Sequence, residues 1–284
     1  MNPLKIFVRA AQIVLLTIIL FISYTAASIF SGATGLRSND PSVATPTDAT
    51  ASLIGLLTAC FLQTLVFAHV ILRARWHGWK LVAATWFAFY GLGTVMLQME
   101  SAVFLPRYLP PGSLITLFSM GAITGAIFLP FAILILRKYR PDPNASAPNT
   151  RLVMPTREWI WKFAVIAIAY VIVYYTFGYF VAWKDPAVQA YYGGADPGNF
   201  FAQLGSIWAT TPWMFFFQAA RGMLWALFTL PVIRMYRGST LGVAIVTGCL
   251  LAVWVAMLLI PNPLMPDAVR RAHIWETAPS NFIF

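Results

Sequence analysis

Two polar side chains interrupt an apolar stretch that is long enough to cross a bilayer. The stretch is Trp213–Gly238, WMFFFQAARGMLWALFTLPVIRMYRG, and the polar residues are Gln218 and Arg221. Inserting an arginine at the centre of a membrane helix costs about 2.5–3.5 kcal/mol of free energy on insertion scales, unless another group neutralises its charge. A guanidinium binds a carboxylate through parallel hydrogen bonds, so we expect a carboxylate elsewhere in the chain to pair with Arg221.

Further polar residues are expected at the depth of Arg221. At the helical rise, Arg221 lies about 12 Å from the start of its stretch. Gln98 and Glu100 end another apolar stretch, and the tail that follows the last stretch contains Pro266-Asp267, which can begin a helix. The candidate binding residues are Gln98, Glu100, Gln218, Arg221, Arg270, His273 and Glu276. Glu100 and Glu276 are both candidate partners of Arg221.

The expected gathering of these polar residues at one depth in the membrane has three interpretations. The first is a buried ion pair that fixes helix register, with the tail covering the bundle. The second is a pocket around Arg221 that binds or translocates a polar or anionic ligand, a lipid headgroup or a partner subunit, and this is the function we favour. The third is a membrane-embedded enzyme acting on a lipid-linked substrate, with His273, Glu276 and Glu100 as acid/base groups, because His273 and Glu276 are three residues apart.

Known reaction and cofactor motifs are absent from the sequence. It contains no Walker A loop, no GxGxxG after a strand, no HExxH and no GxSxG. Cys60 and Cys249 both fall in apolar runs, where cysteine behaves as a small hydrophobe. A His–Glu pair supplies too few ligands for a zinc site. We therefore assign no catalytic residue, metal or cofactor from the sequence.

Composition places the chain in a membrane. Of 284 residues, 60% are hydrophobic and 10% are charged, with a mean hydropathy of +0.73. Soluble domains carry about 25% charged residues. The apolar residues gather in runs of about twenty, the length that crosses the hydrocarbon core. We predict an all-α, polytopic helix bundle with seven spans, at about 7–30, 51–72, 81–97, 113–136, 159–183, 213–235 and 241–260.

The first span has an alternative interpretation, and the fourth contains a packing motif. Small residues near Tyr24–Ser28 resemble a cleavage site, so span 7–30 is alternatively a signal peptide, although the later spans need no leader. Gly121 and Gly125 form a GxxxG pattern, which we interpret as close packing within the chain rather than dimerisation.

Three connections are long enough to carry structure of their own. Residues 137–157 form a basic, proline-rich linker, and residues 261–284 form a tail too polar to cross. In the loop 184–212, apolar residues recur at helical spacing and predict a short helix in the membrane interface. These residues are Phe200, Phe201, Leu204, Ile207 and Trp208.

The basic residues predict the orientation. With the N-terminus cytoplasmic and the C-terminus extracytoplasmic, 13 of the 19 Lys and Arg residues lie inside and 5 outside, with Arg221 in the membrane. The linker is then cytoplasmic, and the 184–212 loop and the tail are extracytoplasmic. The formal charge of +10 indicates topology and contact with anionic lipid rather than nucleic acid. We expect a multi-pass protein of a bacterial cytoplasmic membrane.

Overall fold

A computed structural model describes residues 3–36, 48–141, 151–261 and 264–284. Arg37, residues 142–150 of the expected linker and residues 262–263 of the tail lie outside the described residues. The predicted fold class is confirmed, because the described chain is a helical bundle with seven helices long and apolar enough to span a membrane. These spans are Pro3–Ser31, Ala49–Arg73, Gly78–Phe104, Ser113–Ile135, Thr156–Lys184, Trp213–Met235 and Thr240–Leu259.

Several spans consist of more than one helical element. The α-helices are α1 (Pro3–Ser31), α2 (Ala49–Arg73), α3 (Gly78–Tyr90), α4 (Met96–Phe104), α5 (Ser113–Ile135), α6 (Thr156–Phe180), α7 (Pro186–Tyr192), α8 (Phe200–Thr210), α9 (Trp213–Met235), α10 (Thr240–Ala252) and α11 (Asp267–Ile283). A π-helical segment, η2 (Gly91–Val95), joins α3 to α4, and a 3₁₀ segment, η4 (Val253–Leu259), continues α10. Shorter 3₁₀ turns are η1 (Ala33–Gly35) and η3 (Ala182–Lys184).

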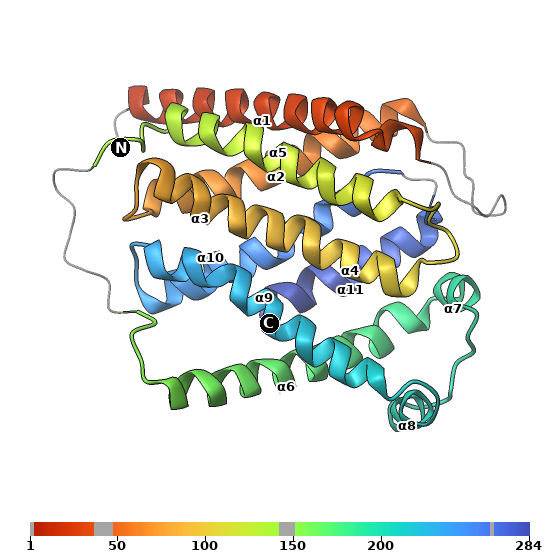
Figure 1. The fold of residues 1–284 in the computed structure, drawn as a ribbon. Helices are drawn as coiled ribbons and strands as arrows, with labels where there is room; N and C mark the ends of the chain where they lie inside the picture. Colours follow the sequence, from red (N-terminus) through yellow and green to blue (C-terminus); the bar gives the residue numbers. More distant parts are fainter. Residues whose placement is uncertain (1–2, 37–47, 142–150, 262–263) are drawn as a thin grey trace.

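The spans run between two chemically different ends (Figure 1). We call one the basic end, since it holds the start of α1 and the connections after α2, α5 and α9. Its Lys and Arg residues are Lys5, Arg9, Arg73, Arg75, Lys80, Arg137, Lys138, Arg140, Arg151, Arg157, Lys162, Arg234 and Arg237. The opposite end carries α7 and α8, and we call it the α8 end. Its described Lys and Arg residues are Arg107, Lys184, Arg270 and Arg271.

The outer surface of the bundle is apolar at the depth of the spans. On α6, for example, Ile160, Val165, Ile168 and Ile172 are all more than half exposed. In a soluble protein such a face would be polar, so these side chains face lipid. The interior is packed with aromatic rings, among which Trp254 is fully buried.

Glycines allow neighbouring helices to approach closely. A Cβ at Gly121 would collide with Thr94, and a Cβ at Gly125 would lie 3.0 Å from Trp86 Cδ1. The GxxxG pattern therefore packs α5 against α3 and η2 of the same chain, as predicted. In η2 itself, a Cβ at Gly91 would collide with the ring of Phe228 on α9.

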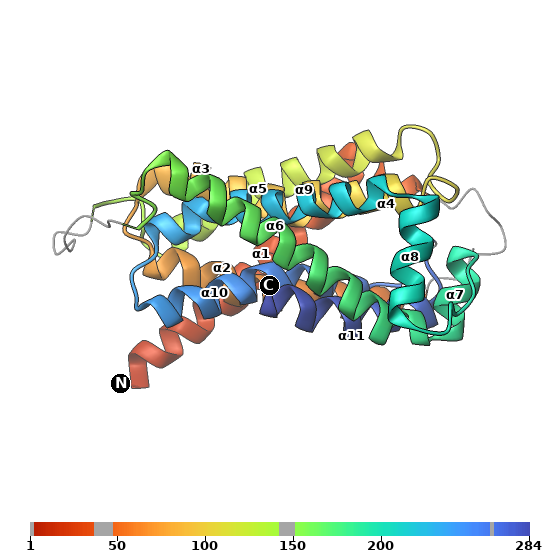
Figure 2. The same ribbon diagram turned by 90° about the horizontal axis from the view of Figure 1, so that it is seen from below.

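Helix α8 crosses the direction of the spans. It is seen end-on in Figure 1 and lengthwise in Figure 2. Asn199 begins it by accepting a hydrogen bond from the amide of Ala202 at 2.8 Å. Phe201 and Trp208 are exposed on α8 by 79% and 58%. A short helix thus forms where the loop sequence indicates one, and its position in a membrane interface stays a prediction.

The tail forms a helix that packs against the bundle. Helix α11 has 17 residues and turns back along the bundle, so that its last residue lies near the middle of the molecule (Figures 1 and 2). The side-chain amide of Asn281 donates to the carbonyl of Leu251 at 3.5 Å, and the ring of Phe284 lies 4.9 Å from that of Tyr170. The small residue Gly248 permits this approach, because a Cβ there would lie 2.6 Å from the carbonyl oxygen of Phe282.

Candidate functional site

Arg221 forms an ion pair inside the bundle. Helix α9 places it at 1% exposure, where its Nη2 donates to Oε1 of Glu100 on α4. Its Nη1 donates to Oε1 of Gln218, one turn earlier on α9, at 2.8 Å. Of the two carboxylates that the sequence offers, the structure therefore pairs Glu100 with Arg221. The Nε of Arg221 is buried and has no hydrogen-bond partner among the described residues.

Aromatic side chains line the guanidinium of Arg221. Its Cζ lies 5.6 Å from the ring centre of Tyr170 and 5.7 Å from that of Phe217, which are cation–π distances. Trp225 holds Tyr170 in place by donating its indole N–H to the hydroxyl at 3.1 Å. Gly222 makes room for this arrangement, since a Cβ there would lie 2.5 Å from Tyr170 Cβ.

Glu100 is the more exposed member of the ion pair. Its side chain is 37% exposed, compared with 1% for Arg221. The residue lies within helix α4, which continues to Phe104, rather than at the end of a helix near Leu97 as the sequence suggests. The π-helical turn Gly91–Val95 adds one residue to the turn before α4, which rotates the following side chains by about 100°. That rotation sets the face on which Glu100 lies.

A second chain of polar contacts lies nearby, on α11 and α7. His273 Nδ1 is 2.6 Å from Glu276 Oε2, and His273 Nε2 is 3.0 Å from the hydroxyl of Tyr192. The His273 and Glu276 side chains are only 18% and 13% exposed. Asp185 begins α7 by accepting from the amide of Ala187 at 2.8 Å, and this helix positions Tyr192.

The surroundings of His273 favour its protonated form. Burial lowers the pKa of the imidazole, but the hydrogen bond and charge of Glu276, together with the charge of Glu100, outweigh burial and leave that pKa raised. Burial raises the pKa of the Tyr192 hydroxyl, and the charges of Glu100 and Glu276 add to the effect. Tyr192 is therefore a neutral hydrogen-bonding partner of His273 and not an activated nucleophile.

The two groups of residues form one electrostatic cluster. The charge of Glu100 acts on His273 and on Tyr192, and Tyr174 on α6 lies within reach of both Arg221 and Glu276. Five elements, α4, α6, α7, α9 and α11, thus contribute to what we call the Glu100–His273 cluster. Its members are Glu100, Tyr170, Tyr174, Tyr192, Gln218, Arg221, His273 and Glu276. The sequence analysis missed the three tyrosines, of which Tyr170 and Tyr174 lie one turn apart on α6.

Two of the candidate residues, Arg270 and Gln98, are not hydrogen-bonded to the Glu100–His273 cluster. Arg270 donates to the carbonyl of Leu258 at 2.6 Å and to Asp267 Oδ1 at 2.5 Å, so it ties the start of α11 to the end of η4. Gln98 is on α4, and its Oε1 is buried with no hydrogen-bond partner in the described part of the chain. The hydrogen bonds of the Glu100–His273 cluster do not include either side chain.

Metal ligation and known relatives give no further assignment. The described residues contain no group of three or more His, Cys, Asp or Glu side chains that could hold a metal ion. Compared with protein families, curated proteins and solved structures, the chain gives no match in any of the three.

The charge balance of the cluster restricts what it can bind. One guanidinium and two carboxylates leave one net negative charge when His273 is neutral and none when it is protonated. Because Arg221 already donates to Glu100 and Gln218, it offers little free charge to an anion. The accessible chemistry is the acceptor oxygen of Glu100, beside the His273–Glu276 pair.

Proposed function

We propose that this membrane protein binds a small polar ligand at the α8 end, at the Glu100–His273 cluster. The observation that carries the proposal is the asymmetry of the ion pair, in which Arg221 is buried and the Glu100 side chain is 37% exposed. Arg221 fixes one carboxylate oxygen, and the open side of Glu100 accepts from a donor on the ligand. Intramembrane ionisable residues commonly mark ligand or ion pathways.

The ligand class follows from the charge balance. A hydroxyl or ammonium group would satisfy Glu100, whereas a free anion would face two carboxylates. Of the polar or anionic ligands that the sequence suggests, the pairing thus favours polar, donor-bearing ones. A lipid headgroup and a water-soluble solute both offer this chemistry.

Native mass spectrometry of the protein, extracted gently from its own membrane, tests the proposal. The informative variant is Arg221→Met/Glu100→Gln, because replacing both partners of a buried pair preserves packing far better than removing one. The matched control is Lys184→Gln/Asp196→Asn, which neutralises an exposed ion pair at the same end, with an N–O distance of 3.2 Å. We expect a retained mass in the wild type and the control, and its loss in the cluster variant.

The solubility of the retained molecule distinguishes a lipid from a water-soluble solute. A mass that organic solvent extracts is a lipid, and one that stays in water is a solute. A second polypeptide chain on the protein would favour the partner-subunit interpretation instead. A bare wild type, or a ligand that survives in the cluster variant, would contradict the proposal and leave a structural ion pair.

The chain of contacts from Tyr192 through His273 to Glu276 favours a second candidate, a membrane-embedded enzyme. A protonated His273 would serve as a general acid towards a lipid-linked substrate, and Glu276 would keep the imidazole oriented. The test is to incorporate wild type and His273→Gln into vesicles made from the native lipid extract and to follow the lipids by mass spectrometry. A product formed only by the wild type supports catalysis, and identical lipid profiles exclude it for those lipids.

We also propose that the basic end faces the cytoplasm of a bacterial cell. The support is the gathering of Lys and Arg residues at that end, which follows the positive-inside rule. Single cysteines at exposed positions test it. Ser206→Cys on α8 is expected to react with an impermeant maleimide in intact cells, and His77→Cys only after permeabilisation. The reverse pattern would invert the orientation.

A further inference from the structure

His273 has hydrogen-bond partners that suit both of its protonation states. Its Nδ1 lies 2.6 Å from Glu276 Oε2, and its Nε2 lies 3.0 Å from the hydroxyl of Tyr192. A carboxylate only accepts hydrogen bonds, so Nδ1 keeps its hydrogen in both states, whereas a phenol hydroxyl can accept or donate. Nε2 therefore donates to Tyr192 when the imidazole is protonated and accepts from Tyr192 when it is neutral. His273 can release the proton from Nε2 without leaving a buried polar atom unpaired.

One face of α6 connects the two ion pairs of the cluster. Tyr170, Tyr174 and Gly178 are four residues apart, so they lie on the same face of the helix. The ring centre of Tyr170 lies 5.6 Å from Arg221 Cζ and 6.3 Å from the ring centre of Tyr174. At the other end of this face, a Cβ at Gly178 would lie 3.5 Å from Glu276 Oε1. Both ion pairs thus lie along about 12 Å of one helix, and their partial burial limits screening by water and salt.

We infer that the Glu100–His273 cluster binds a primary ammonium ligand in exchange for the proton of His273. This inference rests on the proposed function and adds to it the charge of the ligand and its coupling to a proton. The ammonium group donates a hydrogen bond to the exposed side of Glu100. The proton leaves Nε2 of His273 for the solvent, so the net charge of the cluster stays the same.

The charge balance of the cluster requires this exchange. Glu100 and Glu276 share one permanent cation, Arg221, so one further positive charge neutralises the cluster. That charge is either the proton on His273 or the ammonium of the ligand. Burial lowers the pKa of His273, but the hydrogen bond and charge of Glu276 and the charge of Glu100 leave it raised. An ammonium that neutralises Glu100 removes part of this support, and by reciprocity the proton weakens the binding of the ammonium.

The other cations near His273 are already paired. Lys184 on η3 lies 3.2 Å from Asp196, and Arg270 on α11 lies 2.5 Å from Asp267. Helix α10 and η4 also pack against α11, but neither contains an Asp, Glu, Lys, Arg or His residue. The ionisable groups around the His273–Glu276 pair are therefore Tyr192 on α7, Glu100 on α4 and Tyr174 on α6.

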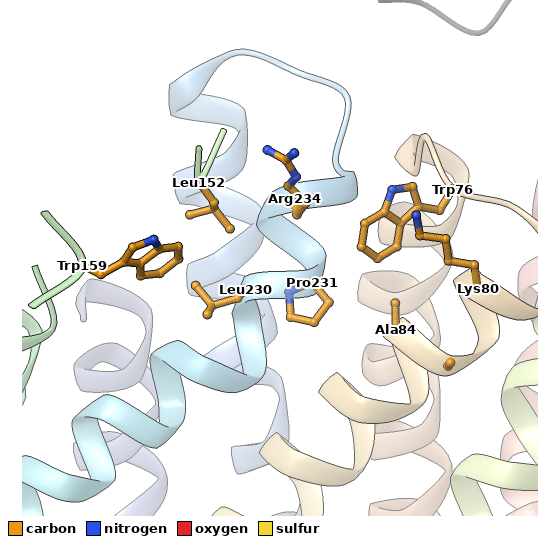
Figure 3. Close-up of a pocket in the computed structure, with 9 residues that line it drawn as sticks. Trp76, Lys80, Ala84, Leu152, Trp159, Leu230, Pro231 and Arg234 are labelled. Atoms are coloured by element: carbon orange, nitrogen blue, oxygen red, sulfur yellow. The ribbon is translucent and has the colours of Figure 1, made fainter. Parts of the chain in front are cut away.

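An open groove at the basic end offers no such acceptor. In Figure 3, Leu152 and Trp159 lie on one side of Arg234, and Trp76 and Lys80 lie on the other. None of the nine side chains that line this groove contains an oxygen atom. An ammonium ligand therefore finds a side-chain acceptor at the α8 end and not in this groove.

Nuclear magnetic resonance of the intact protein in detergent tests the exchange. The chain has three Glu and three His residues, so ¹³C labels at Glu Cδ and His Cε1 give few resonances, which Glu100→Gln and His273→Gln assign. The probe is n-propylamine, which stays charged up to pH ~9 because amines of this type titrate near the Lys value of about 10.4. Its neutral counterpart is 1-propanol.

We expect propylamine to shift the Glu100 resonance and to lower the titration midpoint of His273. The expected shift is about one pH unit, which corresponds to a tenfold coupling between ammonium and proton. Because 1-propanol brings no charge, it is expected to leave the His273 midpoint unchanged.

His273→Gln tests the competition from the other side. Without a competing proton, the variant is expected to bind propylamine about tenfold more tightly than the wild type at pH 6, and equally tightly at pH 9. A role of His273 in the fold alone would weaken binding rather than strengthen it. His77→Gln is the matched control, since it removes an exposed histidine at the basic end, and it is expected to leave the pH dependence of binding unchanged.

The outcomes separate this exchange from the binding site itself. If a probe shifts the Glu100 resonance while the His273 midpoint stays constant or rises with propylamine, the exchange is wrong and the proposed binding site stands. Equal affinities of the wild type and His273→Gln at pH 6 would also overturn the exchange. If neither probe shifts the Glu100 resonance, both the exchange and the proposed binding at Glu100 are wrong.

Discussion

The two ends of the bundle satisfy their cations by different means. At the α8 end, Arg221 pairs with Glu100, and Arg270 pairs with Asp267. At the basic end, several cations donate to main-chain carbonyls, and Lys162 pairs with Glu158. There Lys138 Nζ reaches the carbonyl of Ala74 at 3.0 Å, and Arg151 Nη1 reaches that of Tyr236 at 2.9 Å.

The scarcity of carboxylates explains this difference. Six of the seven described acidic residues lie at the α8 end, namely Asp48, Glu100, Asp185, Asp196, Asp267 and Glu276. The basic end holds 13 Lys and Arg residues and, among the described residues, one carboxylate, Glu158, so its described part carries a net positive charge. At the α8 end, Arg221 and Arg270 are each neutralised by a carboxylate beside them. This end therefore presents hydrogen-bonding groups rather than a strong electrostatic potential. The comparison predicts that removing a charge matters far more at the α8 end.

The largest effect is expected from breaking the Arg221–Glu100 pair. Glu100→Leu leaves a buried guanidinium without its counter-charge and should lower the free energy of unfolding by about 3–5 kcal/mol. Arg221→Leu should cost less, because the carboxylate that it strands is 37% exposed. Thermal unfolding in detergent measures both.

The double variant Arg221→Leu/Glu100→Leu completes the cycle. We expect it to be more stable than Glu100→Leu alone, since neither charge remains. Additive losses would show that the two groups do not interact and would remove the basis of the comparison.

A smaller effect is expected from tightening the helix contact beside the pair. Gly222→Ala places a Cβ 2.5 Å from Tyr170 Cβ and has to separate α6 from α9, at about 1–3 kcal/mol. Gly205→Ala is the control, because no heavy atom lies within 4 Å of a Cβ there and the residue is exposed on α8. A wild-type melting temperature in Gly222→Ala would contradict the close α6–α9 packing.

The basic end supplies the contrasting measurement. Lys138→Met removes the hydrogen bond from a charged donor to the carbonyl of Ala74, and we expect a loss of about 1–2 kcal/mol, the net contribution of such a hydrogen bond. A loss as large as that of Glu100→Leu would show that charge pairing governs both ends.

Much of this arrangement follows from the sequence. Runs of about twenty apolar residues predict the seven spans, and the buried position of Arg221 predicts an acidic partner. The choice between Glu100 and Glu276 does not follow, because it depends on the π-helical turn at Gly91–Val95 and on the return of α11 into the bundle. Both features include a close approach that only a small residue permits, Gly91 against Phe228 and Gly248 against Phe282. The spacing of hydrophobic residues in the sequence does not predict such contacts.

The smallest expected effect concerns the pH dependence that His273 gives to the α8 end. Its folded-state pKa lies above the ordinary value of about 6.5, so its contribution to stability is fully present below pH ~6.5 and is lost as the pH rises through the folded value. The groups that face it are Glu276 on α11, Glu100 on α4 and Tyr192 on α7. His273→Gln should therefore destabilise the protein more at pH 6 than at pH 9.

The difference in melting temperature between wild type and His273→Gln, measured at several pH values, isolates this contribution from other titrating groups. His77→Gln is the control, since His77 is an exposed histidine at the opposite, basic end of the bundle. If the difference for His273→Gln were constant, or increased with pH, His273 would not be held in its protonated form by the two carboxylates. The α8 end would then keep one uncompensated negative charge at neutral pH, which would favour a cationic ligand over a neutral one.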